Sequence, residues 1–280
     1  MASATVHFGV AGWSYADWKD VVYPRNCKDT LRAVAQRVEL VEVNTTFYHP
    51  PVARNCASWV ERTADLGTWF TAKLPQEFTH HGSEDADLVR RTREGFEPLA
   101  ASGRLLALLA QTNWQVEATD RSIDHFARLQ EAFGDLAQLV VEVRHRSWNA
   151  APALERLARH GIAVAALDYP GSVGGFSVDV THCNGAHGIA YFRLHGRNRD
   201  AWFRHGAGRD EVYHWEYGAA EVRQLEQRIE RLAVDAKKLL VVANNHFHGN
   251  AMKVVEQLMA WYRARSAQAR ESAGPGPQAD

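Results

Sequence analysis

Short apolar runs alternate with stretches of helical periodicity along almost the whole chain. The runs have the length and composition of β-strands, and eight of them are found: Val6–Ala11, Val38–Asn44, Thr68–Leu74, Leu105–Gln111, Leu139–Arg144, Ile162–Asp168, Ile189–His195 and Leu239–Asn244. The stretches between them predict helices at Leu31–Val38, Ala53–Leu66, Glu84–Ala100, Ser122–Phe133, Pro152–His160, Ala219–Leu232 and Asn250–Tyr262. Apolar strands joined by crossover helices form parallel sheets that are covered on both faces. Eight such units predict an α/β fold of one (β/α)₈ barrel of the TIM type.

The same pattern sets the domain boundaries. We expect one domain over residues 1–265, and a disordered tail over 266–280, where the sequence loses periodicity and is rich in Gly, Pro, Ala and Ser. A doubly wound open sheet is the alternative fold, but no glycine-rich phosphate-binding motif follows the first strand.

Two connections are unusually long. Residues 169–187 are rich in Gly and β-forming residues, which predicts that a loop replaces the helix after the sixth strand. Residues 196–217 form a second long segment that is aromatic and basic. In a barrel both segments would lie at the C-terminal mouth, so they are candidate lids whose roles the sequence leaves open.

Composition limits the compartment and the partners. The net charge of −1 excludes strong global attraction to polyanions, so an anion site would have to be a local patch. Cys27, Cys56 and Cys183 are odd in number and widely spaced, which favours a reducing cytoplasm over a disulfide framework or a zinc site. No apolar stretch has the length of a membrane span or a signal peptide, so we expect no membrane partner. The oligomeric state is not readable.

Alternation along each strand separates inward from outward side chains. It predicts that pairs of polar residues point into the barrel from four strands: Glu42 and Asn44, Thr71 and Lys73, Glu142 and Arg144, and Arg193 and His195. Asp168 and Gln111 end their own strands, and the same alternation predicts that they also point inward. We therefore expect three carboxylates and three cations to meet at one end of the barrel: Glu42, Glu142, Asp168, Lys73, Arg144 and Arg193.

A cluster of this kind has two interpretations. It can be a self-neutralising ion network without chemistry, or it can be a functional site. Apolar residues of similar volume usually stabilise a core as well as buried ion pairs do, so the functional interpretation is preferred. Buried charges of opposite sign also shift one another's pKa values, which is how acid and base groups are tuned.

Several motifs resemble the domain of unknown function 72, or YecE-like, family. They are AGWSYADWKDVVYP, VEVNTTFYHPP followed by Trp59, FTAKLP followed by Thr79 and His80, VEVRHRSW, LDYP, YFRLHGRN and VVANNHFHGNAMKVVEQL. The resemblance covers roughly residues 8–262 and implies a TIM-barrel fold, but no established reaction. The sequence departs from the family pattern after the fourth strand, where Gln111 is followed by Thr112, Asn113 and Trp114 instead of an aromatic residue and paired prolines. The loop there is expected to differ in shape.

The resemblance also implies which positions belong to the family's motifs. These are Trp13, Tyr15, Trp18, Glu42, Asn44, Phe47, Tyr48, Lys73, Glu142, Arg144, Trp148, Asp168, Arg193, His195, Gly196, Arg197, Asn244 and Asn245. They coincide largely with the side chains that alternation places at the mouth.

Together these observations give a set of candidate site residues. The candidate catalytic residues are Glu142, Lys73, His195, Asp168 and Glu42. The candidate ligand-binding residues are Trp13, Tyr15, Asn44, Tyr48, Arg144, Trp148, Arg193, Arg197, Asn244 and Asn245. Arg144, Arg193 and Arg197 carry forked donors that suit a phosphate or carboxylate.

Two other chemistries are less favoured. Lys73 can form a Schiff base if its pKa is lowered, but neighbouring glutamates would hold it charged, so acid/base work is preferred. Glu42, Glu142, Asp168 and His195 can be drawn as a set of metal ligands, yet the cations in the same mouth argue against a metal. No metal site is predicted and no cofactor is identified.

Three functions remain open. The first is an enzyme that acts by acid/base chemistry on a small anionic or phosphorylated metabolite, such as a hydrolase or isomerase. The second is a protein that processes or binds RNA or DNA with a groove lined by arginine and aromatic side chains. The third is a non-catalytic ligand sensor.

Overall fold

The computed structural model describes residues 4–170, 175–176 and 188–272. Within these residues the strands are β1 Thr5–Ala11, β2 Leu40–Val43, β3 Trp69–Lys73, β4 Leu105–Gln111, β5 Gln138–Glu142, β6 Ala163–Val164, β7 Ala166–Asp168, β8 Ile189–Leu194 and β9 Lys238–Ala243. All pair in parallel, in the order β6-β5-β4-β3-β2-β1-β9-β8-β7. The predicted TIM-type barrel is confirmed.

The expected sixth strand is split in two. β6 pairs only with β5, and β7 pairs only with β8, so the two pieces form the two edges of the sheet. They are consecutive in the chain, separated by Ala165, whose amide donates to the carbonyl of Val141. The barrel therefore closes through a break within one strand.

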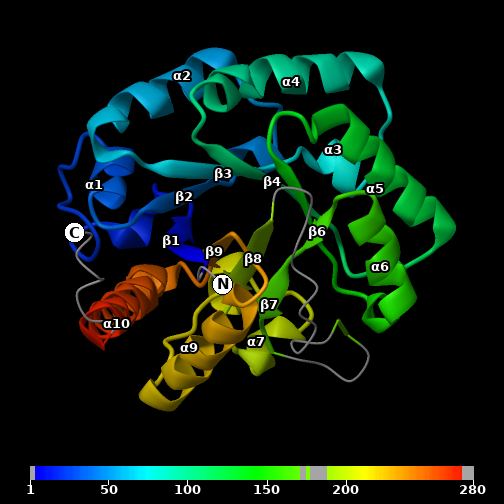
Figure 1. Cartoon of the computed structure of the whole chain (residues 1–280). Helices are drawn as coiled ribbons and strands as arrows, with labels where there is room; N and C mark the ends of the chain where they lie inside the picture. The colour runs from blue at the N-terminus through cyan, green and yellow to red at the C-terminus, as the bar shows by residue number, and fades with distance from the viewer. Residues whose placement is uncertain (1–3, 171–174, 177–187, 273–280) are drawn as a thin grey trace, which may run out of the picture.

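Helices surround the strands (Figure 1). They are α1 Thr30–Ala35, α2 Ala53–Arg62, α3 Gln76–Thr79, α4 Ala86–Ala101, α5 Asp120–Phe133, α6 Ala151–Arg159, α7 Arg199–Trp202, α8 Arg209–Val212, α9 Ala219–Ala233 and α10 Asn250–Ser272. Single 3₁₀ turns lie at Ala16–Trp18, Thr45–Phe47, Ala64–Leu66, Arg146–Asn149 and Phe247–Gly249. No described helix has the length and apolarity that crossing a membrane requires.

The apolar core lies between the strands and this ring of helices. Leu31, Phe96, Phe126 and Leu225 are buried from four of the helices, each at an apolar position of an amphipathic pattern. Inside the barrel, space is tight where strands adjoin. A Cβ added at Gly9 would come within 2.0 Å of the Leu40 carbonyl oxygen, so only glycine fits this position of β1.

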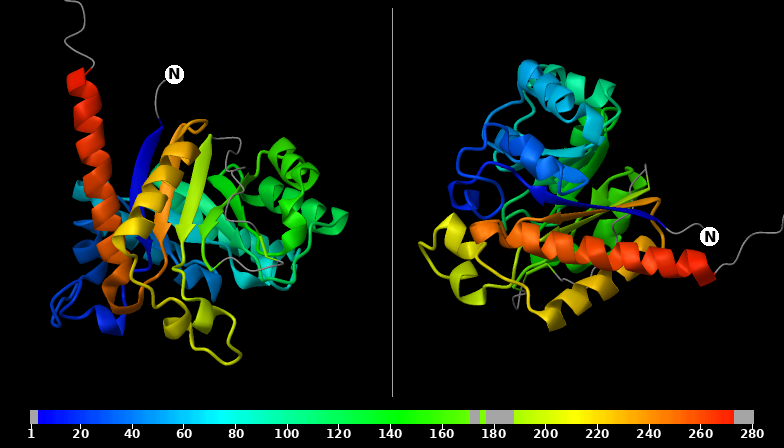
Figure 2. Two further views of the ribbon diagram at one scale, coloured as in Figure 1. Left: turned by 90° about the horizontal axis from the view of Figure 1, so that it is seen from below. Right: turned by 90° about the vertical axis from the view of Figure 1, so that its left-hand side faces the viewer.

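The mouth lies at the carboxyl ends of the strands. Figure 2 shows the N-terminus and the end of α10 at one end of the barrel, and the yellow segment with α7 and α8 at the other. This segment lies within the long connection expected at 196–217, which therefore contains two short helices and is not wholly irregular. Side chains from both helices line the mouth, as a candidate lid requires.

The expected tail at 266–280 and the expected loop at 169–187 are described only in part. α10 continues to Ser272, so helix replaces the first part of the tail expected at 266–280, and residues 273–280 lie outside the described residues. The loop expected at 169–187 is also largely outside them. Of that loop, Phe176 is described, and its amide donates to the Arg144 carbonyl beside the mouth.

Candidate active site

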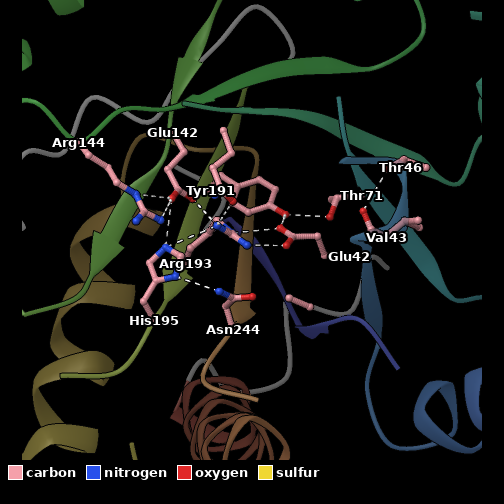
Figure 3. A network of polar contacts seen from close by, with 12 residues as sticks. Glu42, Val43, Thr46, Thr71, Glu142, Arg144, Tyr191, Arg193, His195 and Asn244 are labelled. Atoms are coloured by element: carbon pink, nitrogen blue, oxygen red, sulfur yellow. Dashed lines mark hydrogen bonds and ion pairs between the residues drawn. The ribbon is translucent and has the colours of Figure 1, made fainter. Parts of the chain in front are cut away.

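Arg193, on β8, occupies the centre of the barrel end and has no exposed surface. Its Nε and Nη2 donate to the two carboxylate oxygens of Glu42, at 3.1 and 2.6 Å. Its Nη1 donates to Glu142 and, at 3.2 Å, to Gln111 Oε1. Figure 3 shows the guanidinium lying between the two glutamates. Each of its nitrogens is bonded, so Arg193 has little left to offer a ligand.

Glu42 is held on its other side by Tyr191. The Tyr191 hydroxyl lies 2.7 Å from Glu42 Oε2 and 2.8 Å from Thr71 Oγ1. Burial, together with the Glu42 charge, raises the pKa of Tyr191 well above its usual value. The phenol therefore stays protonated and donates to the carboxylate. Glu42 accepts three hydrogen bonds in all, which leaves it poorly suited to carry a proton to a substrate.

Glu142 is equally engaged. Its Oε1 accepts from Arg144 Nε at 3.2 Å and Nη2 at 2.6 Å, and its Oε2 accepts from Arg193. Burial alone would raise the pKa of Glu142, but Arg193, His195 and Arg144 hold it well below the usual range. The carboxylate is a fixed anion that positions two arginines. We call Arg193, Arg144, Glu42 and Glu142 the Arg193 network.

His195 joins the Arg193 network as a neutral ring. Its Nε2 lies 3.3 Å from Glu142 Oε1, and its Nδ1 lies 3.1 Å from the Asn244 amide nitrogen. A proton on Nε2 satisfies both contacts, because the Asn244 amide then donates to Nδ1. Burial lowers the pKa of His195 to about 4. Its geometry suits a positioning role.

Lys73 ends β3 and points toward the same region, with its Nζ 5.5 Å from the centre of the Phe47 ring. Burial, followed by the Arg193 charge, lowers its pKa to about 8. Both glutamates act in the opposite direction, yet they are already neutralised by two arginines. Among the described residues no carboxylate lies within ion-pair distance of Nζ. The glutamates expected to hold Lys73 charged therefore offset only part of the effect of burial on its pKa.

Two cavities open above the Arg193 network. The small cavity, of about 100 Å³, is lined by Tyr15, Asn44, Phe47, Tyr48, Lys73, Gln111, Arg209, Tyr213, Asn244 and His246. The large cavity, of about 780 Å³, is lined by His80, Gln111, Thr112, Asn113, Trp114, Arg144, His145, Tyr169, Gly175, Trp202, Phe203, Arg204, His205, Val212 and Tyr213. The cavities share Gln111 and Tyr213. The described lining contains lysine and arginine but neither aspartate nor glutamate.

Asp168 lies apart from the Arg193 network. Its carboxylate accepts from Arg197 Nε at 3.0 Å and Nη2 at 2.8 Å, from the Tyr217 hydroxyl at 2.7 Å, and from Arg228 on α9 at 3.4 Å. In the sheet it pairs with Leu194, one residue after the inward Arg193, so it faces the helices. The inward position expected of Asp168 is wrong, and Arg197 is engaged by Asp168, away from Arg144 and Arg193.

The other predicted ligand-binding residues divide into two groups. Tyr15, Asn44, Tyr48, Arg144 and Asn244 line the cavities. Trp13, Trp148 and Asn245 do not: Trp13 packs on Trp59, Trp148 is fully buried with its indole nitrogen bonded to the Val116 carbonyl, and the Asn245 amide donates to the Trp215 carbonyl.

His246 is a site residue that the sequence analysis did not single out, although it lies in the motif VVANNHFHGNAMKVVEQL. The ring is buried and stacks on Tyr15, with centroids 4.5 Å apart and planes at 6°. Neither ring nitrogen has a hydrogen-bond partner among the described residues, although Asp210 Oδ1 lies 3.9 Å from Nε2. Burial, followed by the Arg209 charge, lowers its pKa to about 4. A neutral imidazole with a free lone pair therefore lines the small cavity.

Tyr191, Tyr169, Arg209 and Tyr213 are among the other lining or network residues that were not predicted. Tyr191 lies two positions before Arg193, so strand alternation alone could have found it. Tyr169 follows the sixth strand directly and lines the large cavity. Arg209 and Tyr213 belong to the long connection that was expected to form a lid, but no pattern in it singled them out.

Metal ligands are not grouped in the described part of the chain. No set of three His, Cys, Asp or Glu side chains there could hold an ion. Glu42, Glu142 and His195, three members of the ligand set considered from the sequence, instead bond to arginines and an amide.

The comparisons with known proteins agree with the barrel and its motifs. The family model described as "Protein of unknown function DUF72" matches residues 7–279. The chain belongs to the DUF72 family. It is 24% identical over 269 residues to the UPF0759 protein YunF of Bacillus subtilis strain 168, covering 91% of this chain and 93% of YunF.

Solved structures agree with the family and with the barrel fold. A DUF72 family protein from Thermotoga maritima MSB8 is similar with a TM-score of 0.81 and 29% identity, over 92% of this chain and 99% of that one. D-psicose 3-epimerase from Clostridium cellulolyticum H10, solved with D-tagatose, has a TM-score of 0.51 and 12% identity, over 92% and 98% of the two chains. At that identity the likeness to the epimerase shows the barrel fold alone.

Proposed function

We propose that this DUF72 protein is an enzyme that binds a small anionic metabolite at the barrel mouth and moves a proton on it. One observation carries the proposal. The described lining of the two cavities contains Lys73, Arg144, Arg204 and Arg209 and no carboxylate, while Glu42 and Glu142 lie bonded to arginines beneath. A bound anion would supply the counter-ion that Lys73 lacks among the described residues.

The arginines suit the binding role. Arg144 donates hydrogen bonds from Nε and Nη2 to Glu142, and its guanidinium lies 5.3 Å from the centre of the Trp202 ring. The Arg209 guanidinium lies 6.0 Å from the centre of the Tyr15 ring, and its Nε lies 3.8 Å from an Asp210 carboxylate oxygen. The Arg144 guanidinium is fixed by these neighbours, which lowers the entropy lost when it binds a carboxylate or phosphate, whereas the half-exposed Arg209 side chain remains free to reach a ligand.

Lys73 and His246 suit the proton-transfer role. A general acid or base works best when its pKa is close to the working pH, and burial brings the pKa of Lys73 to about 8. His246 offers an unprotonated ring nitrogen in the same small cavity. The roles first considered for Glu42, Glu142 and His195 are thereby revised to positioning, since all three are engaged in the Arg193 network.

Thermal unfolding in the presence of anions tests this proposal. Phosphate, sulfate and small carboxylates should raise the Tm of the wild type above that in chloride of equal ionic strength, because a ligand that binds only the folded state stabilises it. Arg209→Met should abolish most of the rise. Arg265→Met, on the exposed surface of α10, is the matched control and should retain it.

Two results would count against the proposal. One is that no anion raises the Tm beyond the ionic-strength control. The other is an equal rise in the wild type and Arg209→Met. Turnover is then sought with each stabilising compound, and a compound that binds but is never converted would favour the ligand-sensor hypothesis.

We also propose a reducing cytoplasmic location, which Cys27 and Cys56 support because both are free thiols. Cys183 lies outside the described residues.

A further inference from the structure

We infer that Lys73 acts as a nucleophilic amine that forms a Schiff base with a small aldehyde or ketone bearing an anionic group. The inference rests on the proposed anion site and adds the substrate class and a covalent step. Lys73 lines the small cavity, where its amine nitrogen can meet the carbonyl carbon of a bound substrate.

The lysine is held on a rigid element. It is the last residue of β3, its carbonyl accepts from Thr46 Oγ1 at 2.7 Å, and the next amide, of Leu74, donates to the Leu109 carbonyl at 2.9 Å. Its side chain is nine-tenths buried, with the Phe47 ring beside the amine. A nucleophile fixed in this way loses little freedom when a substrate arrives.

The charges around Lys73 favour the free amine. The Arg193 network holds two arginines and two glutamates, so it is neutral without the lysine. A protonated Lys73 would add an unpaired buried charge next to the Arg193 guanidinium. A lysine that is desolvated and close to another cation is the setting in which amines become nucleophilic at neutral pH. The free amine is therefore accessible without a dedicated base.

The chemistry balances without a further reactant. The Lys73 lone pair attacks the carbonyl carbon, one amine proton passes to the carbonyl oxygen, and a carbinolamine forms. Loss of the second amine proton and of the hydroxyl group releases one water and leaves the carbon–nitrogen double bond. Tyr48 and Tyr213 line the same cavity, and a tyrosine hydroxyl is a donor suited to the departing oxygen. No electrons are gained or lost.

The cavity defines the substrate class. A volume of about 100 Å³ admits a carbonyl compound of few carbons. Its anionic group would be within the cationic lining that Arg209 provides, and it would also balance the positive charge of a protonated imine. A short 2-oxo acid or a phosphorylated short aldehyde has both features.

Reductive trapping tests the inference. The full-length protein is incubated at pH 7.5 with sodium cyanoborohydride and pyruvate, glycolaldehyde phosphate or neutral propanal, and the modified lysines are located by peptide mass spectrometry. A pKa of about 8 gives Lys73 a free-amine fraction about 200-fold above that of an ordinary lysine at this pH. With an anionic probe we therefore expect at least about tenfold more adduct at Lys73 than at the half-exposed Lys253.

The variants and the Tm separate the two proposals. Lys73→Arg keeps a cation but not the amine, so it should retain anion stabilisation and lose the adduct. If pyruvate or glycolaldehyde phosphate stabilises the wild type but neither is trapped at Lys73, the Schiff base is overturned and the anion site stands. Equal labelling of Lys73 and Lys253 also overturns it. Equal trapping of propanal and the anionic probes overturns the substrate class, and absence of both stabilisation and trapping overturns both proposals.

Discussion

Replacing Lys73 by Met should change how the stability of the protein depends on pH. The lowering of the Lys73 pKa from 10.5 to about 8 corresponds to about 3 kcal/mol of folding free energy. Below pH 8 both folded and unfolded chains hold the proton, and the folded wild type bears this whole cost. Between pH 8 and 10.5 the unfolded chain binds more protons than the folded one, so wild-type stability rises relative to the variant. Lys73→Met should therefore be more stable at pH 7, by up to about 3 kcal/mol, and lose this advantage by pH 10.5.

Urea unfolding of both proteins at several pH values measures this difference, and titrations common to both cancel. Lys253→Met is the matched control, because the Lys253 side chain is 50% exposed and its ammonium remains hydrated. A stability difference between the wild type and Lys73→Met that stays constant from pH 7 to pH 10.5 would refute the reasoning.

Three other substitutions test the network and the cavity by urea unfolding. Glu142→Gln removes a charge shared by Arg144 and Arg193 and should destabilise by about 3–5 kcal/mol, whereas a loss under about 1 kcal/mol would contradict a buried ion network. Tyr191→Phe should cost about 1–3 kcal/mol, because Glu42 and Thr71 lose a bonded hydroxyl, and no loss would contradict the contacts. His246→Phe keeps the stacking on Tyr15. Because the pKa of His246 in the folded state is about 4, the wild type should lose up to about 3 kcal/mol more stability than this variant as the pH falls from 6.5 to 4. Parallel curves of stability against pH for the two proteins would contradict a neutral buried ring.

Strand alternation located most of the polar centre because the strands concerned are regular. Glu42, Lys73, Glu142 and Arg193 come from β2, β3, β5 and β8, where successive side chains face opposite ways. The reasoning failed at Asp168, which follows the break at Ala165. A break between two strand pieces depends on how the sheet closes, and no residue near Ala165 signals it in the sequence.

The charge balance could not be obtained from the sequence. Three carboxylates and three cations suggested a self-neutralising ion network, in which Lys73 would have a carboxylate partner. In the structure Asp168 is engaged by Arg197 and Arg228 instead, and Lys73 has no carboxylate partner in the part of the chain that the structure describes. Counting charges does not reveal which of them meet, because the outcome depends on contacts between residues far apart in the chain.

Residues of the long connections were equally beyond prediction. Arg209 reaches the small cavity because α8 folds back over the mouth, and this placement depends on tertiary contacts, such as the bonds from the Asn198 amide to the Glu211 and His214 carbonyls. A basic, aromatic segment can be recognised as a candidate lid from composition, but composition does not reveal which arginine lines the cavity.

The pKa of the Lys73 amine is the quantity on which the account depends most. Competitive acetylation with trace reagent across pH 6–11, read by mass spectrometry of the Lys73 peptide against an added model amine, measures it directly. A value near 8 is predicted, because Lys73 is buried beside Arg193 without a carboxylate partner among the described residues. A value near 10.5 would contradict both the unpaired amine and the proposals built on it.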